Sequence, residues 1–368
     1  MTDPKHPPQH PPHPSAGAGS HGKLRALHGG HDDGLEPLRA LDLGAAGSVD
    51  ALVRGMAATA FGGRRLGEAA DVLEAMVRDP ACFRVLTLSG AMTIAKQGLV
   101  ICEMIDRGWV QAVIATGALV THGFVEGAGM LHFKHRASMD DEELFAKGYN
   151  RVYDTLELEQ NLDDAEKIVN AVLEGLPEGV TLSSHLVTAA LGRYLGAHSE
   201  GRAVLKSAVA HDVPVFIPAF TDSELGLDVA VYNRRRELQG RPRRPFDPFL
   251  DLEAYTDRVR RAERIGIFTI GGGVPRNWAQ QVGPYLEISE KRLGLEEPVR
   301  RFQYGVRICP EPAHWGGLSG CTYSEGVSWG KFVPENEGGR FAEVLADATI
   351  AWPLVVRAVM ERIDRERA

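Results

Sequence analysis

Short apolar runs alternate with amphipathic stretches along most of the chain. Residues 83–92 and 110–120 each begin with an apolar run of strand length and end in a turn of small residues, and a segment with helical period separates them. The same order returns in four later stretches, at 213–226, 265–282, 302–312 and 341–363. Neighbouring parallel strands need a long crossover, which is usually a helix. The pattern therefore predicts an α/β fold with a doubly wound, mostly parallel Rossmann-like sheet and helices on both faces.

The first 33 residues differ from the rest in composition. Pro, His and Gly dominate them, and six of the 13 histidines lie there. So few apolar side chains cannot offset the entropy cost of ordering the segment, which favours a disordered tail over a metal-binding one. From residue 34 the pattern becomes helical, through 34–44 and 66–80, and neither a repeat nor a Pro/Gly linker divides residues 34–368. We expect a disordered tail over 1–33 and one domain over 34–368.

Composition narrows the function classes and the cellular location. The formal net charge of −8 disfavours nucleic acid as a partner and mildly favours cationic ligands. No run approaches the roughly 20 apolar residues that span a bilayer, and no signal-type segment opens the chain. The cysteines are widely spaced, without a Cys-x-x-Cys pair, at Cys82, Cys102, Cys309 and Cys321. This spacing favours reduced thiols in a cytoplasmic protein over a zinc knuckle or a disulfide framework, and we expect no membrane partner.

Turns of small residues follow the predicted strands, at the edge where such sheets bind ligands. They are Ser89-Gly90-Ala91, Thr116-Gly117-Ala118, Thr221-Asp222, Gly271-Gly272-Gly273 and Asp347-Ala348. Glycine there lets the backbone approach a ligand closely, and amide groups at a helix start favour a phosphate. None of the turns fits Gly-x-Gly-x-x-Gly, so the standard dinucleotide fingerprint is absent.

The stretch EGVSWGK, from Glu325 to Lys331, brings a carboxylate, a serine, a tryptophan and a lysine close together in the chain. It resembles the EAVSWGK box of the deoxyhypusine synthase family. Four supporting segments occur in the family's order, at 218–226, 271–274, 316–320 and 345–356. Elements in the right order are more specific than any one motif, and the resemblance extends over about residues 83–362. The chain is similar in particular to the bacterial deoxyhypusine synthase-like branch.

The resemblance implies an NAD-dependent transferase that moves an alkylamine group between amines without net redox change. In the family, NAD takes hydride from an amine such as spermidine. The imine carbon passes to an active-site lysine and then to an acceptor amine, and the same NADH reduces the new imine. Lys331 matches that lysine, and a nucleophilic lysine needs its pKa lowered from about 10.4 by desolvation or by a nearby positive charge. Trp329 can exclude water, and Glu325, with Ser328 nearby, can hold a substrate ammonium.

The family's NAD contacts correspond to the turns described above and to one threonine after the first of them. An aspartate after a strand can accept hydrogen bonds from ribose hydroxyls, which suits Asp222 and Asp347. Either aspartate can instead cap a helix N-terminus, because Asp is favoured there too. The resemblance assigns NAD binding to Ser89, Thr93, Thr116, Gly117, Ala118, Asp222, Gly272, Asp347 and Ala348.

The chain departs from the family where the substrate is bound. Thr121 and His122 stand where the family has a pair of glutamates, and Arg276 and Asn277 stand where it has Lys-His. Such a site should bind a long tricationic polyamine less well, and Arg276 could accept a substrate carboxylate or repel a second ammonium. His122 could replace the family's general base, or it could be a packed histidine beside the turn.

A metal site is not indicated. His132 and His135 have loosely metal-like spacing, but the sequence shows no further His, Cys or carboxylate cluster that would complete a site. We therefore expect no metal.

Three functions remain open. The first is transfer of an aminobutyl-type group to a small amine, as in a homospermidine-synthase-like enzyme of polyamine metabolism, with Arg276 and Asn277 at the substrate. The second is true deoxyhypusine synthase acting on a protein lysine, against which the altered substrate residues count. The third is a non-catalytic NAD-binding scaffold, against which the complete EGVSWGK box counts. The resemblance also implies a homotetramer with active sites at a dimer interface.

Overall fold

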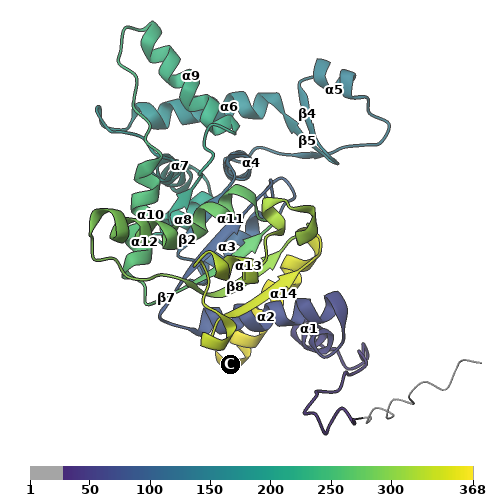
Figure 1. The fold of residues 1–368 in the computed structure, drawn as a ribbon. Coiled ribbons are helices and arrows are strands. Elements are labelled where there is room, and N and C mark those ends of the chain that lie inside the picture. The colour runs from purple at the N-terminus through teal and green to yellow at the C-terminus, as the bar shows by residue number, and fades with distance from the viewer. Residues whose placement is uncertain (1–27, 368) are drawn as a thin grey trace, which may run out of the picture. The chain divides into compact units, whose positions relative to one another are not determined.

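The computed structural model describes residues 28–367 of the chain (Figure 1). The chain forms two compact units, Met1–Leu38 and Arg39–Ala368. The described part of the first unit contains a turn over residues 30–34 and neither helix nor strand. Most of the tail that the sequence predicts over residues 1–33 lies outside the described residues.

The prediction of a helix over residues 34–44 is wrong. These residues have no helical structure, and the side chains of Leu35 and Leu43 are 63% and 69% exposed. Pro37 has no backbone NH that could donate a hydrogen bond within a helix. The two leucines are exposed, so they contribute no burial free energy that would stabilise one. A helix of this length needs tertiary packing to form, and that packing is missing here.

Helices and strands alternate through the second unit. The helices are α1 (Val49–Ala57), α2 (Phe61–Arg78), α3 (Gly98–Asp106), α4 (Gly117–Gly127), α5 (Asp141–Ala146), α6 (Glu159–Glu174), α7 (Ser184–His198), α8 (Val204–Ala210), α9 (Glu224–Leu238), α10 (Phe249–Arg261), α11 (Gly273–Gln280), α12 (Val282–Leu293), α13 (Tyr323–Ser328) and α14 (Ala348–Arg367). The strands are β1 (Cys82–Leu88), β2 (Ala112–Ala115), β3 (Phe133–Lys134), β4 (Tyr149–Val152), β5 (Thr155–Leu158), β6 (Val215–Phe216), β7 (Arg264–Ile270), β8 (Phe302–Ile308) and β9 (Arg340–Val344). None of the described helices combines the length and the apolar character that crossing a membrane requires.

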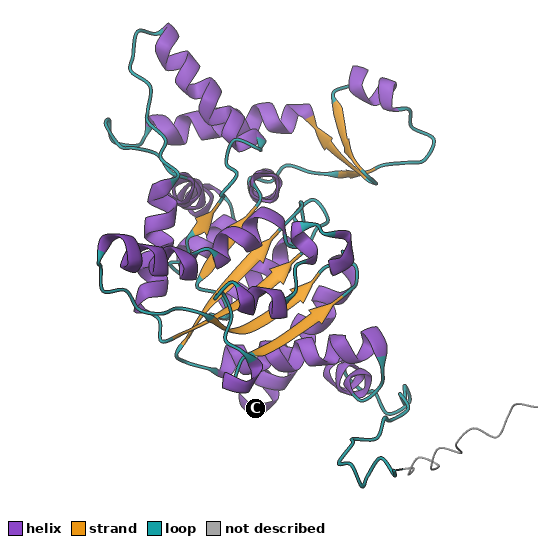
Figure 2. Cartoon of the chain, in the orientation of Figure 1, coloured by secondary structure: helices purple, strands orange, loops and turns teal. Residues whose placement is uncertain are grey.

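Six parallel strands form the central sheet, in the order β6-β2-β1-β7-β8-β9 (Figure 2). Along the chain, β1, β2 and β6 form one half of the sheet, each strand beside the one before it. The chain then returns to the other side of β1, where β7, β8 and β9 form the second half. This is the strand order of a doubly wound dinucleotide-binding sheet. The predicted fold class is confirmed, and each of the six predicted strands is present.

Alternating side chains of the central strands enter two separate apolar clusters. Val85 and Ile267 lie in the cluster that α10, α11, α12 and α13 cover. Leu86 and Phe268, one residue further along each strand, lie in the larger cluster that includes α1, α2, α3, α4 and α14. Because each strand is buried on both faces, its sequence is a nearly continuous apolar run, which is why the strands were predictable.

The strand order reverses between β1 and β7. These two strands pair along their whole length, from Cys82 opposite Arg264 to Leu88 opposite Ile270. The loops that follow them leave in opposite directions along the sheet, which opens a crevice at their carboxyl ends. This crevice is where the fold places a ligand.

A small antiparallel sheet, in the order β3-β5-β4, lies outside the central sheet. The sequence did not predict it, because its strands are only two to four residues long and mostly polar. Phe133 on β3 pairs with Leu156 on β5. This register places His132, just before β3, opposite Glu157 on β5.

Asp228 on α9 is a buried carboxylic acid. The residue is 6% exposed, and burial, together with Glu224 and Glu166, raises its pKa to about 7. The folded state therefore holds a proton on Asp228 between about pH 4 and pH 7 that the unfolded chain has lost. As the pH rises through this window the free energy of unfolding falls.

We predict that Asp228→Asn raises the free energy of unfolding at pH 8, because it removes the cost of ionising a buried acid. The expected gain is on the order of 2 kcal/mol, less than the full pKa shift would give because solvent screens part of the charge. The gain should shrink at pH 5. Chemical denaturation at both pH values measures it, with Asp163→Asn on the exposed face of α6 as the control. An equal effect of Asp228→Asn at pH 5 and pH 8 would contradict the raised pKa.

Candidate active site

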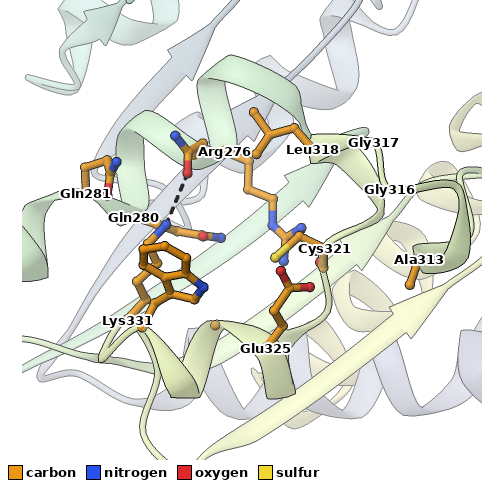
Figure 3. Close-up of a pocket in the computed structure, with 13 residues that line it drawn as sticks. Arg276, Gln280, Gln281, Ala313, Gly316, Gly317, Leu318, Cys321, Glu325 and Lys331 are labelled. Atoms are coloured by element: carbon orange, nitrogen blue, oxygen red, sulfur yellow. Dashed lines mark hydrogen bonds between the residues drawn. The ribbon is translucent and has the colours of Figure 1, made fainter.

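A cavity of about 300 Å³ lies between α11 and the segment around α13, and we call it the lysine cavity (Figure 3). Arg276 and Asn277 line it from α11, whereas Glu325, Trp329 and Lys331 line it from the EGVSWGK stretch. The structure thus brings together five of the six residues that the sequence predicts at the substrate. Ser328 is the exception, because it does not line the cavity and its hydroxyl donates to the backbone oxygen of Glu325 at 2.6 Å.

The small residues of the stretch explain its backbone path. Helix α13 begins where Thr322 Oγ1 accepts a hydrogen bond from the backbone NH of Glu325 at 3.1 Å. A Cβ at Gly326 would lie 2.5 Å from the ring of Phe332, so a larger residue there would require that ring to shift. Gly330 has a φ of 69°, which turns the chain after the helix. The turn directs Lys331 into the cavity.

Lys331 is held at its tip and partly shielded from water. Its Nζ donates to Asn277 Oδ1 at 3.1 Å and lies 5.8 Å from the ring centroid of Trp329. Burial lowers the pKa of Lys331, and the positive charge of Arg276 lowers it further, whereas Cys321 and Glu325 act in the opposite direction. A lowered pKa increases the fraction of free amine at neutral pH, which is the form that attacks an imine carbon.

Arg276 is a buried cation without a carboxylate partner. The residue is 2% exposed, its guanidinium donates to the Cys321 carbonyl at 2.6 Å, and it lies 5.2 Å from the ring centroid of Tyr323. Its Nε and its second terminal nitrogen have no hydrogen-bond partner among the described residues. The other buried arginines each have a carboxylate within 4.0 Å: Arg236 and Arg244 face Glu178, Arg307 faces Glu343, and Arg362 faces Asp50. An unpaired buried charge is costly, so this one calls for a ligand with negative charge.

A second cavity, of about 220 Å³, lies at the crevice where the strand order reverses, and we call it the cofactor cavity. Ser89 and Thr116 line it from the ends of β1 and β2, together with Gly117 and Asp222. The structure thus brings together four of the nine residues that the resemblance assigns to NAD. The carboxylate of Asp222 is exposed and has no hydrogen-bond partner among residues 28–367, so it is free to accept bonds from ribose hydroxyls.

Three consecutive glycines, Gly271 to Gly273, form the turn that leads into α11, and Gly273 lines the cofactor cavity. Gly271 and Gly273 have φ values of 78° and 57°, so a side chain at either position would strain the turn. A Cβ at Gly272 would lie 2.5 Å from Ser319 Cα. The Ser89 hydroxyl donates to the Gly272 carbonyl, which ties together the loops after β1 and β7. The start of α11 lines this cavity, and a helix N-terminus suits the pyrophosphate of a dinucleotide.

Besides Gly272, four residues that the resemblance assigns to NAD lie outside the lining of this cavity. Thr93 is fully buried, and its hydroxyl donates to the Leu119 carbonyl at 2.7 Å. Asp347 accepts hydrogen bonds from the backbone NH and the hydroxyl of Thr349 at 2.7 and 2.8 Å, the arrangement of the alternative helix cap. Ala118 follows Gly117 on α4, and Ala348 begins α14. Their part in NAD binding remains a prediction of the resemblance.

Helix α11 contributes to both cavities. Gly273, Val274 and Pro275 line the cofactor cavity, whereas Arg276 and Asn277 line the lysine cavity. The first turns of one helix thus contribute side chains to both cavities. A substrate beside Lys331 and a dinucleotide at the crevice would approach each other there.

His122 lies apart from both cavities, in a cluster with two further residues. Its Nδ1 is 3.0 Å from Glu157 Oε2, and His132 Nε2 is 2.5 Å from the same oxygen. Burial alone would raise the pKa of Glu157, but the neighbouring side chains of His122, His132 and Asn161 lower it to about 2. These three side chains are close enough to hold a metal ion. No motif along the chain indicates the cluster, because the pairing of β3 with β5 supplies Glu157.

Comparison with known proteins identifies the family. The family model described as "Deoxyhypusine synthase" matches residues 51–359. A protein of Methanosarcina acetivorans named "Probable deoxyhypusine synthase 2" is 34% identical over 316 residues, which cover 86% of this chain and 87% of that protein. The "Deoxyhypusine synthase-like protein" of Chlorobaculum parvum is 31% identical, over 84% of this chain and 85% of that protein.

A solved structure supports the same fold. The crystal structure of a "putative deoxyhypusine synthase" from Entamoeba histolytica is similar with a TM-score of 0.57 at 13% identity, over 88% of this chain and 97% of that one. From the family model and the relatives we conclude that this chain belongs to the deoxyhypusine synthase family, whose members are NAD-dependent aminobutyltransferases.

Proposed function

We propose that Lys331 carries the transferred alkylamine group as an imine in the lysine cavity. The observation that carries this proposal is a lysine with a lowered pKa, held by Asn277 beside a buried arginine. The free amine of Lys331 attacks the carbon of the protonated imine that hydride removal leaves on the donor. The C–N bond to the donor's amine then breaks, and that amine leaves with one proton that Lys331 gives up. The acceptor amine then displaces Lys331 in the same way. Glu325 would hold the ammonium of an incoming amine.

The cofactor cavity would hold NAD. Ser89, Thr116, Gly117 and Asp222 would contact it, with the amides after Gly272 at its phosphates. When bound, NAD supplies the acceptor for the donor's hydride and later returns that hydride to the product imine. His122 as the base for the accompanying proton transfer stays a prediction from the sequence, and its position outside both cavities does not support it.

We favour a small amine over a protein lysine as the acceptor, in a homospermidine-synthase-like reaction. The unpaired guanidinium of Arg276 supports this choice, because it suits an amine substrate that also carries an acidic group. A long polyamine with three positive charges would place an ammonium near that guanidinium.

A protein lysine as acceptor is the second candidate. The names of the relatives favour it, since the proteins of Methanosarcina acetivorans and Methanosarcina mazei are both named as probable deoxyhypusine synthases. The chemistry at Lys331 would be the same in both cases. Only the acceptor distinguishes them.

Product analysis separates these candidates. We expect incubation with NAD, a donor amine and small acceptors to give transferred products, identified by mass spectrometry, and no modification of a protein that serves as acceptor for true deoxyhypusine synthases. Putrescine and 4-aminobutyrate form a matched pair, because a carboxylate replaces one aminomethyl group. Arg276→Gln should reduce use of 4-aminobutyrate by about 10-fold or more relative to putrescine, since it removes a charged hydrogen bond. An equal loss for both amines would mean that Arg276 does not recognise the acidic group and acts through Lys331 or through folding, and efficient modification of the protein would establish the second candidate.

NAD should be required without being consumed. Catalytic amounts of NAD should support many turnovers, with no accumulation of NADH absorbance, because the hydride returns to the product. Gly272→Val should weaken NAD binding, since its side chain would collide with Ser319. Release of one NADH for each product would instead identify an amine dehydrogenase.

We also propose a homotetramer. Leu227, Val231 and Leu238 lie along one side of α9 and are 54%, 50% and 80% exposed, which suits a covered surface. The assembly would work in the cytoplasm, where the four free cysteines stay reduced. Light scattering at micromolar concentration should give the tetramer mass, and Leu238→Glu should reduce it. An active wild-type monomer would contradict this proposal.

A further inference from the structure

Three side chains from separate elements converge on one point beside α4. His122 comes from α4, His132 immediately precedes β3, and Glu157 lies on β5. One potential ligand atom from each lies within 4.8 Å of the others. The pairing of β3 with β5 sets His132 opposite Glu157, and α4 supplies the third group.

The cluster is closed to solvent. The side chains of His132 and Glu157 are 0% and 1% exposed, and that of His122 is 16% exposed. His132 Nε2 is buried without a hydrogen-bond partner, although Glu157 Oε2 lies 2.5 Å away. The ring nitrogen is therefore not directed at that oxygen. A bound ion would direct both lone pairs at itself and would move these two atoms further apart than the present 2.5 Å.

Two hydrogen bonds to its other oxygen orient the carboxylate of Glu157. Glu157 Oε1 accepts hydrogen bonds from Asn161 Nδ2 at 2.6 Å and from the backbone NH of Leu158 at 3.1 Å. These bonds leave Oε2 to face the two histidines. Outer hydrogen bonds of this kind fix the carboxylate ligands of metal sites.

We propose that His122 Nδ1, His132 Nε2 and Glu157 Oε2 form a site for a divalent transition metal such as Zn²⁺. Two imidazoles and one carboxylate are a common set of protein ligands for zinc, with water in the fourth position. The ion would join the small sheet to α4, the helix whose first residue, Gly117, lines the cofactor cavity. His122 Nε2 would stay free on the other side of the ring. The proposal reverses the expectation from the sequence, and it does not depend on the proposed function.

Lys96 is the one feature of the cluster that opposes a metal. Its Nζ lies 2.8 Å from His132 Nδ1 and 3.1 Å from Glu126 Oε1. A lysine that donates to Nδ1 leaves the imidazole proton on Nε2, where it would block the ion. The Lys96 side chain is 47% exposed, so it can move toward Glu126 when a metal binds. Removing its ammonium should therefore strengthen metal binding.

Cobalt titration of the full-length protein tests the site. After treatment with a chelator, wild-type protein should bind one Co²⁺ ion tightly that His132→Ala and Glu157→Gln do not bind. This additional ion should give visible d–d absorption. The histidines of residues 1–33 contribute equally in every variant, so the difference measures only this site. His135→Ala is the matched control, and it should bind as wild type does.

Lys96→Met provides an independent test in case His132→Ala or Glu157→Gln fails to fold. It should lower the Co²⁺ dissociation constant by about 10-fold, the size of effect that outer-shell changes have. Zn²⁺ should also raise the melting temperature of wild type and not that of Glu157→Gln. Equal cobalt binding by wild type and His132→Ala, or unchanged affinity in Lys96→Met, would show that the cluster is only a hydrogen-bonded network.

Discussion

The parallel pairing of β1 with β7 is the constraint on which the site depends. The seven-residue register places Leu88 opposite Ile270, so the two strands end at the same level. A buried hydrogen bond of 2.8 Å between the hydroxyls of Thr87 and Thr269 joins them near that end. Because β2 and β8 then lie on opposite sides of the pair, nothing fills the space above it. The cofactor cavity occupies this place, and α11 leaves from its rim toward the lysine cavity.

Electrostatics then decides what the lysine cavity can do. Lys331 and Arg276 bring two basic groups to a partly dry site, and Glu325 is the acidic side chain that lines the same cavity. The proximity of Arg276 favours the neutral amine of Lys331, as imine exchange requires. Arg276 itself stays charged and unpaired. Burial is the main cause of the lowered pKa of Lys331, and the charge of Arg276 adds to it. The same guanidinium is the group that we propose binds an acidic substrate.

Much of this arrangement could be predicted from the sequence, and the reasons are local. The six central strands are buried on both faces, so each is a short apolar run. The EGVSWGK stretch is contiguous, because a helix of six residues and one left-handed glycine deliver Glu325 and Lys331 to the same cavity. The grouping of Ser89, Thr116 and Asp222 follows from the rule that loops at the carboxyl edge of a parallel sheet meet.

The features that could not be predicted depend on contacts between distant segments. Arg276 is a substrate candidate in the sequence, but its lack of a carboxylate partner is a property of the packing around it. Glu157 meets His132 because a two-residue strand pairs with β5, and His122 reaches the same carboxylate from α4. Strands that short leave no hydrophobic pattern. The prediction of a helix over residues 34–44 was wrong for the opposite reason. The helical pattern is present in the sequence, but its leucines stay exposed.

Borohydride trapping during turnover tests the central claim most directly. An imine on Lys331 should be reduced to a stable adduct, and peptide mass spectrometry should find the mass of the transferred group on the peptide that contains Lys331. Lys331→Arg should still bind NAD and should form no adduct, because a guanidinium is a poor nucleophile at neutral pH. Wild-type enzyme that turns over with its adduct on another lysine, or with no adduct at all, would contradict the account.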